Sequence, residues 1–169
     1  NSPYIKEIAN TYDDLIINPK SLLKFINESL KIKKTVIESD EFDKSERNKF
    51  NYGHTFGHAI ETSSNYVIKH GQAVTVGMDI ANYISYYLGL IDLDEYNRMK
   101  HNIEFNFPDY KWSNFDVDIF INSLLSDKKN EGEKLGCILT KGPGCLVKKF
   151  LTIDEEFKNV INKYFEKLK

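Results

Sequence analysis

Three of the four histidines in the chain lie within a span of 17 residues, at positions 54, 58 and 70. His54 and His58 are four residues apart, so in a helix both imidazoles would emerge on one face, one turn apart. A pair with this spacing can present two nitrogen atoms to a metal ion or to a bound substrate. Glu61, seven residues after His54, would share that face and complete a set of the form HxxxHxxE. His70 opens the next predicted helix, where Gly71 would permit close approach of the backbone.

A histidine pair with this spacing is more often part of a polar helix face than a metal site. Two glycines change that balance, because Gly53 and Gly57 flank the histidines within the predicted helix. Each costs about 1 kcal/mol relative to alanine inside a helix, so either a ligand or a neighbouring backbone must need the space. Together with His70, this pattern predicts a functional site in which the imidazoles of His54 and His70 converge.

Hydrophobic residues recur at helical spacing through most of the chain. The first helix is predicted to follow Asn18, an N-cap residue that precedes a proline at the first helical position. Capping boxes are predicted at Asp92 with Glu95 and at Thr152 with Glu155. The predicted helices cover residues 19–37, 51–64, 71–88, 92–105, 116–126 and 152–167, with a loop or short helix at 38–48.

Residues 134–150 have a different character, because short apolar runs flank the sequence Gly142-Pro143-Gly144. Two short strands around a tight turn are expected there. Residues 71–88 are apolar on more than one face, which predicts a buried helix, and Gly89 would end it. The chain shows neither a repeat nor a linker. We therefore predict one mainly α-helical domain over residues 1–169 with a small β-hairpin near residues 134–150.

The composition of the 169-residue chain excludes several classes of protein. A net charge of −2 gives no electrostatic argument for a nucleic acid or an anionic membrane as a partner. No apolar run approaches the ~20 residues that a spanning helix needs, and no signal-peptide pattern is present. Cys137 and Cys145 are too few for a disulfide framework and fit a reduced compartment. We therefore expect a cytoplasmic protein with no nucleic-acid or membrane partner.

The sequence NYGHTFGHAIE at residues 51–61, followed by HGQAVTVGM at residues 70–78, closely resembles the signature of the 3-dehydroquinate synthase family. That signature reads N-x-G-H-T-F-G-H-A-I-E and then H-G-E-A-V-x-x-G-M. The flanking residues agree as well, because Lys33 precedes Asp-Glu by seven residues and Arg47 precedes the first motif by four. Asp127-Lys128-Lys129 resembles a later D-K-K element of the family. The resemblance covers about residues 30–150.

The resemblance implies a phosphorus–oxygen lyase that converts 3-deoxy-D-arabino-heptulosonate 7-phosphate to 3-dehydroquinate and phosphate. This is a step of the shikimate pathway, which serves aromatic amino acid biosynthesis. It also implies two cofactors, NAD and one divalent metal ion, typically zinc. In the family an N-terminal Rossmann-like domain binds NAD and a helical C-terminal domain carries the metal. The expected partners are thus a phosphorylated small-molecule substrate, the protein's own NAD domain and, at full length, a second copy.

The resemblance also assigns roles to individual residues. His54 and His70 match the two histidine ligands of the metal. His58 matches a histidine that contacts substrate and helps to move protons. Glu61 matches a position of the motif that is not a metal ligand, so the resemblance removes it from the HxxxHxxE set. The positions that match substrate-contacting residues, and that we expect to be catalytic together with His58, are Lys33, Arg47 and Asn51.

The chain departs from the family pattern in three ways. The third metal ligand, a glutamate, and the NAD domain would both precede Asn1, so we expect a piece of a longer protein that is inactive alone. Gln72 replaces the glutamate of the HGE motif, and Cys145 stands where a lysine usually follows the hairpin turn. Two alternatives therefore stay open. One is another sugar-phosphate cyclase or a related metal- and NAD(P)-dependent alcohol dehydrogenase, and the other is a non-catalytic domain.

Overall fold

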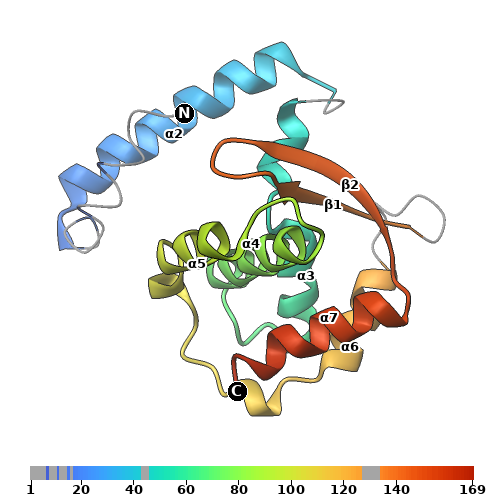
Figure 1. Ribbon diagram of the computed structural model, residues 1–169. Helices are drawn as coiled ribbons and strands as arrows, with labels where there is room; N and C mark the ends of the chain where they lie inside the picture. The colour runs from blue at the N-terminus through green and yellow to red at the C-terminus, as the bar shows by residue number, and fades with distance from the viewer. Residues whose placement is uncertain (1–6, 8–10, 12–14, 16, 43–45, 127–133) are drawn as a thin grey trace. The chain divides into compact units, whose positions relative to one another are not determined.

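The computed structural model describes residues 7, 11, 15, 17–42, 46–126 and 134–169 of the 169-residue chain (Figure 1). Backbone contacts divide the chain into two compact units, Asn1–Asn48 and Lys49–Lys169. Each unit is described by itself, and the single domain expected over residues 1–169 stays a prediction. Within the described residues, no helix combines the length and the apolar character that a membrane span requires.

The main element of the N-terminal unit is helix α2 (Pro19–Ser39). The side chain of Asn18 caps it by accepting a hydrogen bond of 3.2 Å from the backbone N–H of Lys20. Proline at the first helical position adds to this cap, because its missing N–H would have no helical partner there. The start and the length predicted for this helix are therefore confirmed.

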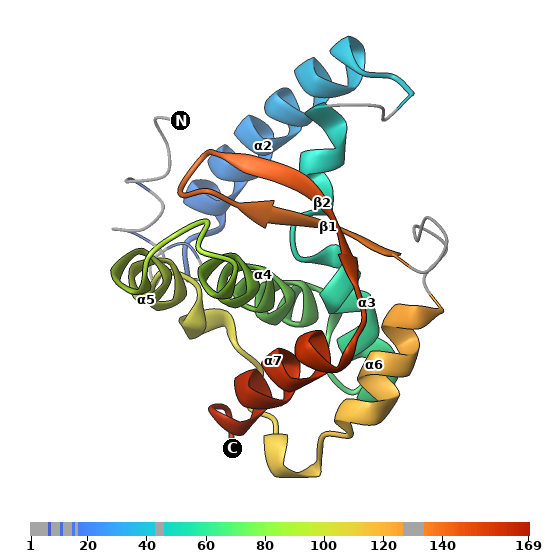
Figure 2. The same cartoon turned by 45° about the vertical axis from the view of Figure 1, so that its right-hand side comes forward.

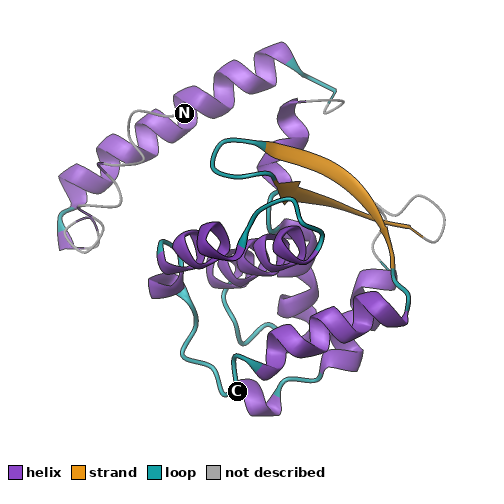
Figure 3. Ribbon diagram, in the orientation of Figure 1, coloured by secondary structure: helices purple, strands orange, loops and turns teal. Residues whose placement is uncertain are grey.

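The C-terminal unit contains most of the helices and one antiparallel hairpin, which Figure 3 separates by colour. A 3-10 helix, η1 (Glu46–Asn51), leads into it. The mainly α fold with a small hairpin is thus confirmed. The further elements are, in chain order, α3 (His54–Ser63), α4 (His70–Tyr87), α5 (Leu93–His101), η2 (Glu104–Asn106), η3 (Trp112–Asn114), α6 (Val117–Leu125), β1 (Lys134–Thr140), β2 (Leu146–Thr152) and α7 (Glu155–Glu166).

Helix α4 occupies the middle of the C-terminal unit and packs against α3, α5, α7 and β1 (Figure 2). It is buried on several faces, as its sequence predicts, and its side chains at Val76, Ile80 and Ala81 are fully shielded from solvent. Gly89 follows its end with a φ of +67°, a conformation that glycine adopts without steric cost. The buried helix and its glycine stop are both confirmed.

The hairpin pairs β1 and β2 in a register that places Lys134 opposite Thr152 and Thr140 opposite Leu146. Strand β1 is the inner strand, with five of its residues buried in succession before Thr140, which is also buried. The turn between the strands contains Gly142 with a φ of +116° and Gly144 with a φ of +75°. These left-handed conformations explain why the turn requires glycine at both positions. The predicted strands and turn are confirmed.

Two predicted helix boundaries in the second half of the chain are wrong. Helix α5 ends at His101, and the residues up to Phe105 fold as a separate 3-10 turn, η2, instead of continuing the helix. The last helix is capped by Asp154, whose carboxylate accepts a hydrogen bond of 2.9 Å from the N–H of Phe157. Thr152 is not available as the cap, because it is the last residue of β2 and pairs with Lys134.

A buried carboxylate lies in the core beside α4. Asp79 is fully buried and accepts a hydrogen bond of 2.8 Å from the hydroxyl of Tyr164 on the same oxygen that lies 3.8 Å from Nζ of Lys100. Its other oxygen, Oδ1, has no hydrogen-bond partner among the described residues. Burial raises the pKa of Asp79 to about 6, although the charge of Lys100 and the hydrogen bond from Tyr164 oppose this shift.

The Asp79 carboxylate predicts a specific dependence of stability on pH. Because the folded state binds this proton more tightly than the unfolded chain does, stability falls as pH rises from about 4 to about 6. Above about pH 6 the loss of stability caused by the ionised Asp79 carboxylate is complete, and it is on the order of 3 kcal/mol. Asp79→Asn removes the titrating group but keeps an oxygen that can accept from Tyr164. In urea unfolding from pH 4 to pH 7, the free energy of unfolding of the variant should therefore rise relative to that of the wild type as pH rises.

The matched control for this prediction is Asp94→Asn, which changes an exposed aspartate on α5. Its unfolding free energy should follow the wild-type pH profile closely. A profile for Asp79→Asn that runs parallel to the wild type across the same range would contradict the prediction.

Candidate functional site

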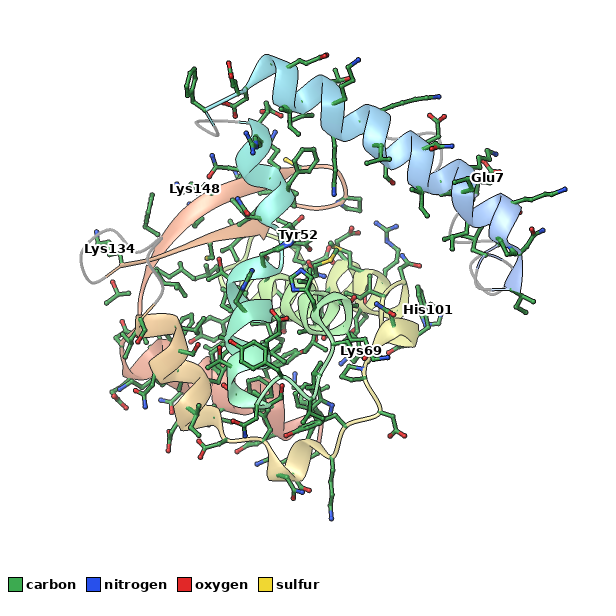
Figure 4. All side chains as sticks on the ribbon, turned by 180° about the vertical axis from the view of Figure 1, so that it is seen from behind. Glu7, Tyr52, Lys69, His101, Lys134 and Lys148 are labelled. Atoms are coloured by element: carbon green, nitrogen blue, oxygen red, sulfur yellow. The ribbon has the colours of Figure 1, made fainter. Side chains whose placement is uncertain are left out.

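The three clustered histidines meet at one place on the C-terminal unit. His54 is the first residue of α3, His58 lies one turn later, and His70 is the first residue of α4. The ring centroids are 5.9 Å apart for His54 and His58, 5.5 Å for His54 and His70, and 5.7 Å for His58 and His70. Tyr52 and Lys69, labelled in Figure 4, mark the chain just before each helix. The predicted convergence of His54 and His70 is confirmed.

The glycines beside the histidines make room for a neighbouring backbone. A Cβ atom at Gly57 would lie 2.9 Å from Cα of Val74 on α4, and one at Gly53 would lie 2.6 Å from the carbonyl oxygen of Val74. From the other side, a Cβ atom at Gly77 would lie 2.1 Å from the carbonyl oxygen of Gly53. Helices α3 and α4 therefore touch backbone to backbone. The space beside Gly53 and Gly57 is thus needed by a neighbouring backbone and not by a ligand.

Two details of the glycine pattern differ from the prediction. Gly53 does not lie inside the helix but is its N-cap, with a φ of +79°, so α3 begins at His54 and not at residue 51. This conformation favours glycine and turns the chain directly into the helix. Gly71 was expected to permit close backbone approach, but a Cβ atom there would meet no described atom within 4 Å.

The two histidines predicted to bind metal each have Nδ1 next to an acceptor oxygen. Nδ1 of His70 lies 3.2 Å and 3.1 Å from the carboxylate oxygens of Glu61. Nδ1 of His54 lies 3.4 Å from the carbonyl oxygen of Tyr52. Because an ionised carboxylate and a carbonyl only accept hydrogen bonds, both contacts suit the tautomer with hydrogen on Nδ1. In a neutral imidazole that tautomer has its lone pair on Nε2, the nitrogen through which it would bind a metal ion.

Glu61 lies between two of the imidazoles. Besides its contact with His70, its Oε2 is 3.8 Å from Nδ1 of His58, one helical turn away. Only 14% of the Glu61 side chain is exposed, against 57% for His58 and 56% for His70. The carboxylate is thus engaged by imidazole nitrogens, and the imidazoles themselves face solvent.

The loop between α3 and α4 brings His70 back to Glu61. Two successive residues in it, Asn65 and Tyr66, have φ values of +50° and +59°. The N–H of Tyr66 donates a hydrogen bond of 2.7 Å to the carbonyl oxygen of Glu61, which closes the turn at the end of α3. Left-handed conformations at two residues that are not glycine are uncommon, and no pattern in the sequence predicted them.

The donors of the His54 and His70 pair suit zinc, which binds neutral imidazole nitrogen. The described residues include no group of three or more His, Cys, Asp or Glu side chains arranged to hold a metal ion. The two imidazoles therefore make a partial ligand set that needs at least one further donor. That this donor comes from chain outside this sequence stays a prediction.

The other predicted site residues lie in different parts of the structure. Asn51 ends η1, three residues before His54. Lys33 lies on α2 and belongs to the N-terminal unit, as does Arg47, whose backbone N–H donates to the Asp40 carboxylate at 3.0 Å. Because the units are described separately, a joint site of these cations with the histidines stays a prediction. The Asp-Lys-Lys element at residues 127–129 lies outside the described residues.

The two positions that depart from the family pattern also differ in their surroundings. Gln72 is partly buried in the first turn of α4, two residues after His70. Cys145 is an exposed free cysteine in the turn of the hairpin. Cys137, by contrast, is buried on β1, and burial raises the pKa of its thiol to about 12. Of the two thiols, Cys145 is therefore the accessible one.

A groove that the sequence did not predict opens beside His58, between α3 and α6. Its volume is about 570 Å³. Most of the residues that line it carry hydroxyl or amide groups, and the hydroxyls of Thr55, Thr62 and Ser126 already donate to backbone carbonyls. The signal in the sequence is weak, because the two helices are far apart along the chain. The polar lining residues other than His58 are Thr55, Thr62, Asn122, Ser123 and Ser126.

Comparison with known proteins gives consistent results. Residues 2–130 match the family model described as 3-dehydroquinate synthase C-terminal. The 3-dehydroquinate synthase of Helicobacter pylori strain P12 is 38% identical over 124 residues, covering 73% of this chain and 36% of the relative. That of Campylobacter concisus strain 13826 is 35% identical over 145 residues, covering 84% of this chain and 41% of the relative. The chain thus spans about two fifths of the length of these curated relatives.

Solved structures of sugar-phosphate cyclases share the fold. A 2-deoxy-scyllo-inosose synthase complexed with carbaglucose-6-phosphate, NAD+ and Co2+ superposes with a TM-score of 0.76 at 28% identity, over 86% of this chain and 43% of that one. A 2-epi-5-epi-valiolone synthase from Streptomyces hygroscopicus subsp. jinggangensis 5008, with NAD+ and Zn2+ bound, has a TM-score of 0.75 at 15% identity, over 98% of this chain and 46% of that one. The second likeness concerns the fold alone. With its histidine motif, its fold and its match over residues 2–130, the chain belongs to the 3-dehydroquinate synthase C-terminal family.

Proposed function

We propose that this chain is the metal- and substrate-binding part of a 3-dehydroquinate synthase. The full-length protein would convert 3-deoxy-D-arabino-heptulosonate 7-phosphate to 3-dehydroquinate and phosphate, in the shikimate pathway and in the cytoplasm. The observation that carries the proposal is the convergence of His54 and His70, each with Nδ1 engaged by an acceptor. Curated 3-dehydroquinate synthases that are 35% and 38% identical to the chain support the choice of reaction.

The proposal gives the site residues distinct tasks. His54 and His70 hold a divalent metal, probed most simply as zinc, through Nε2, and a further ligand comes from outside this sequence. When bound, the metal stabilises an ionised substrate hydroxyl and NAD accepts and returns a hydride. His58, exposed and next to Glu61, transfers protons to and from the substrate. Asn51, Lys33 and Arg47 bind the substrate, where the guanidinium of Arg47 can grip a phosphate or carboxylate with two hydrogen bonds.

The proposal also covers the rest of the protein. Hydride transfer requires an NAD-binding domain, which we place in the part of the full-length enzyme that this sequence does not include. We therefore propose that this chain alone is inactive, and that the full-length enzyme is a homodimer. The chain covers only 36% and 41% of the length of the curated relatives, and the uncovered part of these relatives supports an additional domain.

A second candidate is another sugar-phosphate cyclase. The likeness to 2-deoxy-scyllo-inosose synthase, at 28% identity, favours it, and so do the two departures from the family pattern at Gln72 and Cys145. The same metal- and NAD-dependent chemistry would then act on a different sugar phosphate. The two candidates differ only in substrate, so one assay separates them.

The test is release of phosphate by the full-length protein. We expect release from the heptulosonate phosphate, with a requirement for both NAD and a divalent metal ion. Release only from another sugar phosphate would favour the second candidate. Binding of NAD and metal without release from any member of a panel of sugar phosphates would contradict both.

His58→Ala tests proton transfer separately from metal binding. The variant should lower kcat by about 10²- to 10⁴-fold, the usual contribution of a general acid–base group. Its metal content should equal that of the wild type, because His58 is not assigned as a ligand. His101→Ala is the control, since His101 lies on α5, pairs with Glu104 and is not assigned to the site. Loss of metal together with activity in His58→Ala would instead make His58 a ligand.

A further inference from the structure

The contact between Glu61 and His70 joins two helices. Glu61 lies near the end of α3 and His70 begins α4, and both carboxylate oxygens lie within 3.2 Å of Nδ1. His70 is 56% exposed, so surrounding side chains enclose its ring only in part. The Glu61 side chain is only 14% exposed and is therefore itself well confined. A confined acceptor next to an exposed ring is suited to set the direction of that ring.

The hydrogen bond determines more than the direction of the ring. A neutral histidine in water favours the tautomer with hydrogen on Nε2, which has its lone pair on Nδ1. The Glu61 carboxylate can only accept, so at His70 it selects the opposite tautomer, with hydrogen on Nδ1 and the lone pair on Nε2. Ligand histidines in metal sites generally donate their second nitrogen to such a carboxylate or carbonyl.

We infer that Glu61 is a positioning residue, which fixes the tautomer and direction of His70 so that Nε2 is presented to the metal ion before the metal arrives. This inference rests on the proposed function, because it takes His70 as a metal ligand. Glu61 itself does not bind the metal. The carbonyl of Tyr52, 3.4 Å from Nδ1 of His54, has the corresponding place at the other histidine.

The backbone around Glu61 supports this role. The carbonyl oxygen of Glu61 accepts the hydrogen bond from Tyr66 that closes the turn after α3, so the residue is held at both its backbone and its side chain. The contact of α3 with α4 through Gly57 and Gly77 fixes the spacing of the two helices. The packing of α3 on α4 and the turn after α3 thus set the geometry in which Glu61 and His70 meet.

The chain contains a natural control for this arrangement. Nδ1 of His101 lies 3.1 Å from Oε1 of Glu104, which matches the distance at His70. That pair is local, three residues apart, and more exposed, with 84% of His101 and 46% of Glu104 accessible to solvent. It lies on α5 and η2 and contains none of the three clustered histidines. Glu104→Gln therefore removes an equivalent charge from an imidazole without changing the proposed site.

The first experiment measures the tautomer of His70 directly. Full-length, metal-free protein labelled with ¹⁵N-histidine would be studied by NMR at pH 8, with the His70 signals assigned from a His70→Gln sample. We expect hydrogen on Nδ1 in the wild type and in Glu61→Gln, whose amide oxygen can accept the same hydrogen bond. In Glu61→Ala the signal should move to the tautomer with hydrogen on Nε2. A wild-type His70 with hydrogen mainly on Nε2 would overturn the inference.

The second experiment measures zinc affinity of the full-length protein by competition with a chromophoric chelator. Loss of a carboxylate behind a ligand histidine typically weakens metal binding by about 10- to 100-fold, and we expect this for Glu61→Ala. Glu61→Gln should lie between Glu61→Ala and the wild type, and Glu104→Gln should equal the wild type. If Glu61 had only a structural role, the near-isosteric glutamine would preserve the wild-type zinc affinity. An intermediate affinity for Glu61→Gln therefore indicates positioning. Equal affinity in Glu61→Ala and the wild type would overturn the inference.

The two experiments distinguish failure of the inference from failure of the proposed function. If the wild type binds zinc through His54 and His70 but Glu61→Ala changes neither affinity nor tautomer, only the inference fails. If the wild type binds no divalent metal, the proposed function fails, and so does the inference that His70 is positioned for one. Thermal unfolding shows whether Glu61→Ala is still folded. If it is not, the inference is tested by the zinc affinity of Glu61→Gln and by the His70 tautomer of the wild type.

Discussion

Replacing His54 or His70 with alanine is expected to remove the metal ion from the full-length protein and to abolish phosphate release. Each histidine supplies one nitrogen donor, and the described residues hold no third side chain in place to substitute for it. The measurement is metal content by atomic emission after dialysis, combined with the phosphate-release assay. Activity should fall below detection in both variants, in contrast to the partial loss expected for His58→Ala.

The control for these variants is again His101→Ala, which removes an imidazole from α5 and should change neither metal content nor rate. His54→Ala also requires a check of stability, because His54 begins α3 next to the glycine contact. Retention of stoichiometric metal in either His54→Ala or His70→Ala would show that the histidine in question is not a ligand.

A methyl group at Gly77 is expected to destabilise the C-terminal unit severely. The added Cβ atom would lie 2.1 Å from the carbonyl oxygen of Gly53 and 2.7 Å from the backbone nitrogen of Gly57. Both neighbours are backbone atoms, so no rotamer change relieves the overlap. Overpacking typically lowers stability by about 1–3 kcal/mol. Because this clash is with backbone atoms, we expect a loss of stability at or above the upper end of that range. Urea unfolding of Gly77→Ala should show a loss of about 3 kcal/mol or more.

Gly71→Ala is the matched control on the same helix. A Cβ atom at Gly71 would meet no described atom within 4 Å, so the substitution should keep or increase stability, by up to about 1 kcal/mol from helix propensity. If Gly77→Ala were as stable as Gly71→Ala, the backbone contact between α3 and α4 would not be essential to the fold.

The features that the sequence predicted well are local. The cap at Asn18 and the hairpin turn depend on residues adjacent in the chain, and the structure has both. The spacing of His54 and His58 is likewise a property of one helix. The convergence with His70 involves two helices, and it was predicted from the spacing of the histidines together with the glycines beside them.

The features that the sequence missed depend on tertiary contacts. Gly77 looks like an ordinary helical glycine until α3 is packed against it, and Glu61 looks like a possible ligand until His70 occupies its carboxylate. Thr152 with Glu155 has the form of a capping box, but pairing of Thr152 with Lys134 in the hairpin leaves the cap to Asp154. In each case a residue distant in the chain changes what the local pattern predicts.

The backbone contact between α3 and α4 also limits how the protein can move. Helices that slide past each other in shear motions do so through small adjustments of the side chains between them. At Gly53, Gly57 and Gly77 the contact is mainly between backbone atoms, with only the side chains of Val74 and Met78 also close by. We therefore expect the two helices to move together, so that any closure around the imidazoles bends the chain in the segments that flank the pair.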